Sequence, residues 1–267
     1  MDTHLSRNRP SRNRIEAIDF LRGVAVLGIL AINITGFWGP SLATFSPAIP
    51  QAEPGGAAWY SFAFVVFEGK MRALFSLLFG ASMVLFAEAA ERQGANPDMA
   101  QLRRLLWLAL FGYIHFALLW WGDILFTYAL CGLGVLALRQ VSPLRQIAIA
   151  VPFYVLAQSI EALLALPGVM TEQAVLAGTA PAADVAEQAG MMVRVGESVR
   201  HDLAILNTGF IDAVRLKLAH APMQPLSVTL ATFTETMPLM LIGMAALRGG
   251  FFTAWSRQRL AWIAVSG

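Results

Sequence analysis

The sequence is poor in charged residues and in cysteine. Only 13% of its 267 residues are charged and 57% are hydrophobic, whereas about a quarter of a soluble domain is charged. So few charges cannot cover a globule in water, which excludes an ordinary soluble protein. The single cysteine, Cys131, excludes an internal disulfide and a cysteine-based metal site. We therefore expect a membrane protein without a metal centre or a tightly bound cofactor.

Lysine is also scarce, because only Lys70 and Lys217 are lysines among 19 basic residues. The arginines gather near the ends of apolar stretches, which is typical of membrane proteins and not of nucleic-acid-binding surfaces. We expect the lipid bilayer to be a partner and nucleic acid not to be one. The sequence sets no oligomeric state.

Long apolar stretches predict an all-α, polytopic transmembrane helix bundle. A membrane-spanning helix needs roughly 20 mostly apolar residues. Six stretches meet this need, and a seventh begins near residue 258. The chain stops at Gly267 inside that last apolar run, so we expect it to be truncated. The six predicted spans cover residues 17–38, 66–87, 103–121, 123–140, 145–167 and 226–247.

The spans divide the chain into four parts. Residues 1–14 form a basic tail that we expect to be disordered, and residues 15–167 hold the first five spans. Residues 168–225 form a long segment with helix-compatible patterns, and residues 226–267 hold the sixth span and the start of the seventh. The arginine-rich segments all fall on one side of this arrangement. The positive-inside rule places that side and the N-terminus in the cytoplasm, so the segment 168–225 is predicted to be extracytoplasmic.

Ionisable residues inside the spans are the candidate functional groups, because each costs about 2.5–3.5 kcal/mol on insertion scales. Asp19 and Arg22 are three residues apart in the first span and can pair. Asn33 follows Arg22 by eleven residues, about 16 Å along a helix, so one stripe of the span is polar. The alternative is a structural ion pair at the helix end and an amide that binds a neighbouring helix.

Charged residues also mark the second span and the turn after the third. Glu68 and Arg72 are four residues apart and can pair, with Lys70 between them. Together with Asp123, these residues are candidates for an ion pathway. They could instead be interfacial side chains that reach toward water, and Asp123 could cap the helix that it precedes.

His115 and Glu235 are the candidate proton-transferring residues. His115 lies about 16 Å from Arg104 along its helix, where it could act as a proton relay or general base. It could equally be a neutral histidine bonded to a backbone carbonyl. Glu235 stands among three threonines shortly before Pro238, and this pattern predicts a locally opened, hydrated helix.

The adjacent Arg103 and Arg104 open the third span. Two guanidinium groups could hold a phosphate by bidentate hydrogen bonds. The alternative is that they serve only as the positive-inside signal.

Three motifs in order give the chain a resemblance. RIEAIDFLRGVAVLGILAINI (14–34), FEGKMRALFSLLFGAS (67–82) and RRLLWLALFGYIHFALLWWGDILFTYALCG (103–132) together resemble the YeiB-like family of bacterial inner-membrane proteins. Members of that family are longer than this chain, and their biochemical function is poorly defined. The resemblance implies a multi-pass protein of the bacterial inner membrane.

The YeiB-like family in turn resembles the transmembrane acyltransferases, which include heparan-alpha-glucosaminide N-acetyltransferase. The shared element is Asp-x-x-Arg-Gly, here Asp19, Arg22 and Gly23. The resemblance implies transfer of an acyl group from cytoplasmic acyl-CoA, a co-substrate, to an extracytoplasmic sugar or lipid. The catalytic histidine of the related O-acyltransferases falls at Asn33 here, so His115 is the remaining intramembrane histidine.

Three functions stay open at this point. As an acyltransferase, the protein would hold the co-substrate through Asp19, Arg22, Arg103 and Arg104, and it would catalyse transfer with His115, Glu235 and Asn33. As a proton- or ion-coupled transporter of a small solute, it would use Glu68, Lys70, Arg72 and Asp123 with the same His115 and Glu235. As a non-catalytic structural membrane protein, it would use these polar residues only to join helices.

Overall fold

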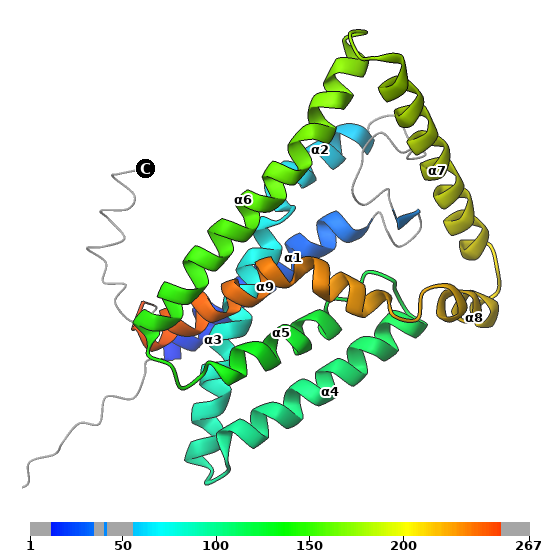
Figure 1. Ribbon diagram of the computed structural model, residues 1–267. Coiled ribbons are helices and arrows are strands. Elements are labelled where there is room, and N and C mark those ends of the chain that lie inside the picture. Colours follow the sequence, from blue (N-terminus) through cyan, green and yellow to red (C-terminus); the bar gives the residue numbers. More distant parts are fainter. Residues whose placement is uncertain (1–11, 35–39, 42–55, 252–267) are drawn as a thin grey trace, which may run out of the picture.

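The computed structural model describes residues 12–34, 40–41 and 56–251, and these residues form helices without a strand (Figure 1). The all-α prediction is therefore confirmed for the described residues. The helices are α1 (Arg12–Asn33), α2 (Gly56–Phe67), α3 (Lys70–Arg92), α4 (Pro97–Leu118), α5 (Leu125–Ala137), α6 (Pro143–Leu176), α7 (Ala182–Leu206), α8 (Phe210–His220) and α9 (Gln224–Arg248).

Three helical segments are long and apolar enough to cross a membrane. They are Ser61–Arg92, Pro143–Leu176 and Gln224–Arg248, which correspond to the second, fifth and sixth predicted spans. The first and third predicted spans coincide with α1 and α4, which do not meet the same standard of length and apolarity. The fourth corresponds to α5, which has only 13 residues and is shorter than a span needs. The count of six therefore stays a prediction, and the seventh span lies outside the described residues. Residues 1–11 of the predicted tail 1–14 lie outside them too, whereas the expected disorder of residues 12–14 is wrong, because α1 begins at Arg12.

Proline and glycine positions explain where the helices differ from the predicted spans. Gly69 adopts φ 70°, a conformation that suits glycine, and it separates α2 from α3. The fifth predicted span ends at Pro167, but helix α6 continues through this proline to Leu176. Pro225 lies in the first turn of α9, where its missing N–H costs no hydrogen bond.

The centre of the molecule is the crossing of α3 and α9, and two glycines bring their backbones together. A Cβ atom at Gly80 would lie 1.8 Å from the carbonyl oxygen of Met240, and one at Gly243 would lie 1.9 Å from that of Leu77. Side chains at these positions would separate the helices, so the contact depends on small residues from both partners.

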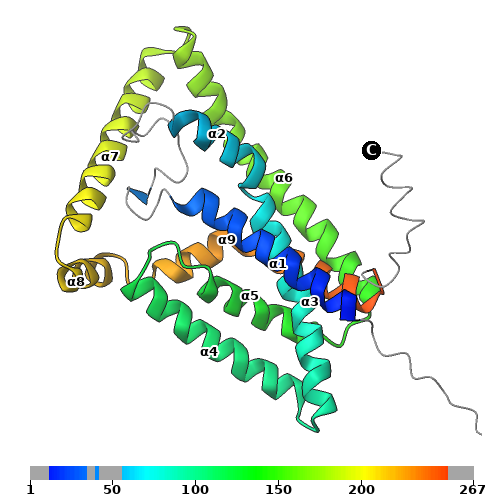
Figure 2. The same ribbon diagram turned by 180° about the vertical axis from the view of Figure 1, so that it is seen from behind.

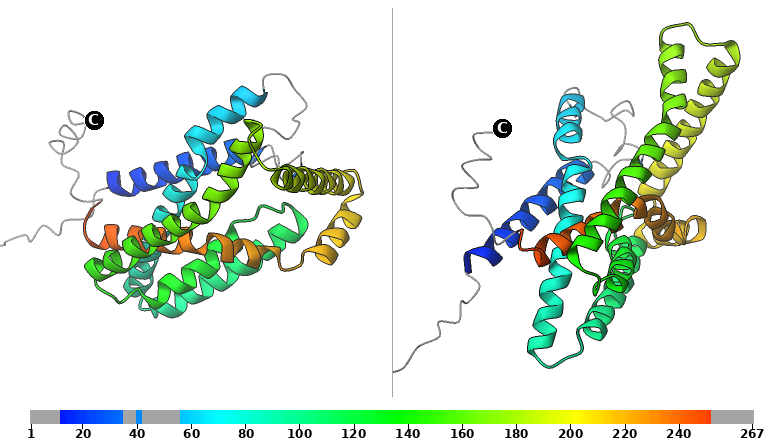
Figure 3. Two further views of the ribbon diagram at one scale, coloured as in Figure 1. Left: turned by 45° about the horizontal axis from the view of Figure 1, so that its top comes forward. Right: turned by 60° about the vertical axis from the view of Figure 1, so that its left-hand side comes forward.

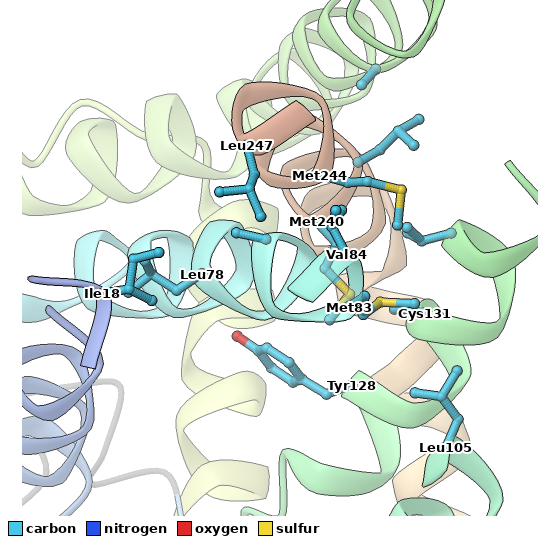
Figure 4. Packing of buried hydrophobic residues seen from close by; sticks show 14 residues of the cluster. Ile18, Leu78, Met83, Val84, Leu105, Tyr128, Cys131, Met240, Met244 and Leu247 are labelled. Carbon is cyan, nitrogen blue, oxygen red and sulfur yellow. The ribbon is translucent and has the colours of Figure 1, made fainter. Parts of the chain in front are cut away.

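The largest buried side chains surround this crossing (Figure 4). Met83 of α3, Tyr128 and Cys131 of α5, and Met240 and Met244 of α9 have 2% or less of their surface exposed. Methionine side chains adapt to irregular gaps, which suits the junction of three helices that cross at different angles. The core therefore joins α3, α5 and α9 into one packed unit.

Helices α4 and α5 form a hairpin, with the turn 119–124 between them. A Cβ atom at Gly112 would lie 2.3 Å from the backbone nitrogen of Phe126, so this glycine lets the two helices approach at the turn. The hairpin packs α5 against α9 and leaves α4 on the outside (Figure 1).

Three basic segments meet at the end of the bundle that lies opposite this turn. Nε of Arg139 donates a 2.6 Å hydrogen bond to Asp98, and Nη1 of Arg248 donates to the backbone carbonyls of Arg139 and Val141. These contacts join the first turn of α4, the α5–α6 loop and the end of α9. The charge pattern predicted that these segments share one side. That this side of the protein faces the cytoplasm stays a prediction.

Helices α6, α7 and α8 form an arm that leaves the bundle and returns to the end of α4 (Figures 2 and 3). Only 6% of the apolar part of α6 is buried, and Leu163 and Leu164 are exposed. An apolar helix with so little cover is typical of a lipid-facing segment. The helices predicted within 168–225 are present as α7 and α8.

Candidate functional site

An ion-pair network lies where α3 passes α9. The Nη2 and Nε atoms of Arg72 donate to the two carboxylate oxygens of Glu235, at 2.9 and 3.3 Å. The Nη1 atom of Arg72 lies 3.5 Å from Oε1 of Glu68. The fork of the guanidinium group matches a carboxylate in this way, and such paired hydrogen bonds are strong and directional. Two carboxylates and one arginine leave the network with a formal charge of −1.

The backbone of Arg72 is held by a second set of hydrogen bonds. Its carbonyl oxygen accepts from Ser76 Oγ at 2.9 Å and from Tyr128 Oη at 3.2 Å. The two hydroxyl oxygens lie 2.8 Å apart, and the hydroxyl of Tyr128 points toward α3 (Figure 4). Sequence reasoning missed Tyr128. The available signal was a tyrosine inside an apolar helix, because a buried hydroxyl requires a partner.

A cavity of about 190 Å³ adjoins this network. Its wall includes four of the predicted site residues, Asn33, Glu68, Arg72 and Asp123, which come from α1, the α2–α3 turn, α3 and the α4–α5 turn. Polar side chains of α5 and α9 also line it, namely Thr127, Tyr128, Thr232 and Thr236. The structure therefore gathers polar groups from six parts of the chain around one space inside an apolar bundle.

Asp123 connects this cavity to His115. The Asp123 side chain is buried, and its Oδ2 accepts a 2.9 Å hydrogen bond from the backbone N–H of Phe126, so it caps α5. Its Oδ1 lies 3.0 Å from Nδ1 of His115. The orientation at this separation does not complete a hydrogen bond, and neither atom has another partner among the described residues.

The two predicted proton-transferring residues lie behind the cavity wall. Glu235 contacts the cavity residue Arg72, and His115 contacts the cavity residue Asp123, but neither is itself a lining residue. The predicted opening of the helix around Glu235 is wrong, because α9 stays helical through Pro238. Lys70 is exposed and donates to the carbonyl oxygen of Val65, so it lies apart from the network.

A second group of predicted residues lies toward the basic end of the bundle. Arg22 pairs with Asp19 at 3.2 Å on α1, as their spacing predicted. Arg104 lies close enough to Arg22 for the two positive charges to repel each other. Its guanidinium group packs on the rings of Phe79 and Phe86, 5.4 and 5.1 Å from their centroids.

Arg104 has no counter-ion among the described side chains, and its buried Nη1 atom has no hydrogen-bond partner there. Arg103, by contrast, is exposed. Adjacent residues on a helix point in different directions, so the arginine pair expected to act together is divided. Arg104 is therefore close to the charge of Arg22, whereas Arg103 points toward the surface.

The described residues contain no group of three or more histidine, cysteine, aspartate or glutamate side chains placed to hold a metal ion. The polar groups around the cavity and around Arg22 and Arg104 are hydrogen-bond donors and carboxylates. Such groups suit an organic or phosphate-bearing ligand.

Three similar proteins are each described as uncharacterised. The chain is 36% identical over 154 residues to the uncharacterised protein YxaH of Bacillus subtilis (strain 168), and this match covers 55% of the chain and 38% of YxaH. It is 38% identical over 128 residues to an uncharacterised 39.9 kDa protein of Bacillus acidopullulyticus, covering 48% of the chain and 35% of that protein.

It is also 40% identical over 117 residues to the uncharacterised protein YeiB of Escherichia coli (strain K12), covering 43% of the chain and 29% of YeiB. The matches thus span little more than a third of these relatives at most. No family model matches the chain, and no solved structure matches it. The likeness to YeiB-like proteins is confirmed, whereas the resemblance to acyltransferases stays a prediction.

Proposed function

We propose that the protein is an inner-membrane acyltransferase that takes an acyl group from cytoplasmic acyl-CoA. The observation that carries this proposal is the pair of sites that α1 connects. Near one end, Arg22 is close enough to Arg104 for their charges to repel, and Arg104 is a cation without a counter-ion among the described residues. At the other end, Asn33 lines a cavity rich in hydrogen-bonding groups.

The spacing of the two sites fits the co-substrate. Arg22 and Asn33 are eleven residues apart on one helix, which is about 16 Å along the axis. An extended pantetheine arm has a comparable length. Phosphates held at Arg22 and Arg104 would therefore bring the thioester to the cavity, where Asn33 could donate to the developing oxyanion.

Asp123 is the best-placed proton acceptor for the reaction. It lines the cavity, whereas His115 lies behind it and would stabilise the carboxylate as a positioning residue. The acceptor's hydroxyl or amine would lose its proton to Asp123 as it attacks the thioester carbonyl. The carbon–sulfur bond then breaks, and coenzyme A leaves as a thiolate that takes up a proton.

Calorimetry of acyl-CoA binding to the full chain in lipid nanodiscs tests the phosphate site. We expect Arg104→Ala to weaken binding at least about tenfold, because a charge-assisted hydrogen bond contributes about 1.5–3 kcal/mol. Arg103→Ala is the matched control, since that side chain is exposed, and it should bind as the parent does. An acyl-pantetheine without phosphates should bind poorly to the parent protein. Equal binding by Arg104→Ala would overturn the proposal.

A proton-coupled transporter is the second candidate, and a different observation favours it. Two ionisable residues of the cavity wall each have a second ionisable group behind them, Glu235 behind Arg72 and His115 behind Asp123. Such chains of titratable groups are typical of proton relays. This reading predicts solute flux in proteoliposomes that depends on a pH gradient and stops in Glu235→Gln, without any release of coenzyme A.

A further inference from the structure

A second cavity, of about 530 Å³, lies between the α4–α5 turn and helices α7 and α8. Its size falls in the range of sites that hold a small organic molecule, roughly 300–1,000 Å³. Its wall is mostly apolar and includes Leu119, Trp120, Trp121 and Phe210. Neither the acyl-CoA site nor the inner cavity uses the polar residues of this outer cavity.

Lys217 supplies the outer cavity with a positive charge. Its Nζ atom donates a 3.0 Å hydrogen bond to the carbonyl oxygen of Phe116 and lies 5.7 Å from the centroid of the Phe116 ring. An ammonium group has three N–H donors, so this contact leaves two of them for a ligand. Burial lowers the pKa of Lys217, and no carboxylate among the described residues pairs with it to offset this effect.

The acidic residue of the cavity is already engaged elsewhere. Oδ2 of Asp202 accepts hydrogen bonds from the backbone nitrogen and the hydroxyl of Ser41, at 2.8 and 2.7 Å. It therefore serves as an acceptor for Ser41, which lines the same cavity, and the carboxylate keeps its negative charge. No ion pair joins Asp202 to Lys217, so the ammonium group stays available to a ligand.

Two histidines also line the cavity. The ring centroids of His201 and His220 lie 5.2 Å apart, and the ring planes are tilted by 58° to each other. Nδ1 of His220 lies 2.9 Å from the carbonyl oxygen of Leu216. A carbonyl can only accept, so Nδ1 carries the proton and Nε2 remains for another contact.

We propose that the outer cavity binds an amphipathic organic anion, whose acidic group contacts Lys217 and whose apolar body lies along Trp120 and Trp121. The combination of one ammonium group that no described carboxylate pairs with and a mostly apolar wall selects this class. A neutral apolar molecule would leave the ammonium donors of Lys217 unsatisfied, and a small inorganic anion would leave the apolar wall empty. This inference does not depend on the proposed function.

The two tryptophans also line the inner cavity. A ligand in the outer cavity would therefore lie against the wall that separates it from Arg72 and Asp123. Their indole groups also provide a signal, because energy transfer from tryptophan to a dansyl group reports a ligand bound beside them.

The test is titration of the full chain, in phosphatidylcholine nanodiscs, with dansylaminoundecanoic acid. Energy transfer is measured against empty nanodiscs and against the uncharged methyl ester of the same probe. We expect the acid to bind at least about tenfold more tightly than the ester, as one charge-assisted contact would give.

Variants of α8 locate the contact. Lys217→Met should lose the preference for the acid, and Lys217→Arg should keep it. Arg215→Met is the matched control, because Arg215 is exposed on the same helix and pairs with Asp212. Equal binding of acid and ester by the parent protein would overturn the proposal, and this comparison needs no variant to fold. Unchanged discrimination in Lys217→Met would overturn it as well.

Discussion

Arg72 and Glu235 are 163 residues apart in the sequence and share two hydrogen bonds across the α3–α9 crossing. Their side chains are 34% and 17% exposed, so the pair is partly removed from water. A charge in such a position that loses its partner keeps its desolvation cost without the compensating contact.

The pair should therefore show coupling in a double-mutant cycle. We expect Arg72→Met and Glu235→Gln each to lower the free energy of unfolding by about 1–3 kcal/mol, and the double variant to lose less than the sum. Reversible unfolding in mixed micelles measures all four proteins. Additive losses would mean that the contact contributes nothing to stability.

The glycines of the crossing give a prediction about packing. Gly80→Ala and Gly243→Ala would each place a methyl group about 2 Å from a carbonyl oxygen of the other helix, and we expect a cost of about 1–3 kcal/mol or more for this overpacking. Gly23→Ala is the matched control, since a Cβ atom there meets nothing within 4 Å. It should be neutral or stabilising, because alanine favours a helix. Thermal unfolding of the three variants checks the ranking.

Asp98 gives the protein a predicted sensitivity to acid. The hydrogen bond from Arg139 holds the pKa of Asp98 below its ordinary value. The folded state therefore binds this proton less readily than the unfolded state does. The stabilisation is fully present above the unfolded value, near pH 4, and it is lost as the pH falls through the lower folded value.

Because about half of the Asp98 side chain is exposed, we expect this effect to be less than about 1 kcal/mol. Asp98→Asn should remove it and flatten the unfolding midpoint between about pH 5 and pH 3. Glu88→Gln is the control variant for this pH dependence. Glu88 is exposed, and its Oε2 atom lies 3.8 Å from Nη1 of Arg92. A midpoint that falls equally steeply with acid in Asp98→Asn would contradict the assignment.

Local patterns predicted most of the helices, because each depends on neighbours in the sequence. The three-residue spacing of Asp19 and Arg22 predicted their ion pair. The position of Asp123 before a helix predicted that it caps that helix. Arg72 shows where this reasoning stops. The four-residue spacing along the helix predicted the contact of Arg72 with Glu68, which is 3.5 Å long. The shorter contact of Arg72, at 2.9 Å, is with Glu235 on another helix.

The partner of a charge on another helix depends on how the two helices cross. That crossing is set by Gly80 and Gly243, whose sequence context is no different from that of other small residues. The same argument applies to Arg103 and Arg104. Their adjacency in the sequence suggested joint action, but helical rotation directs them to different surroundings.

The close approach of α3 and α9 also limits how the molecule can change shape. Backbones that touch at two points, one from each helix, cannot slide past each other or turn about their own axes without collision. The contact acts as a fixed pivot. A motion that opened the inner cavity to either side of a membrane would have to tilt α1 or the α4–α5 hairpin around it, so a crosslink between α3 and α9 should leave such a motion intact.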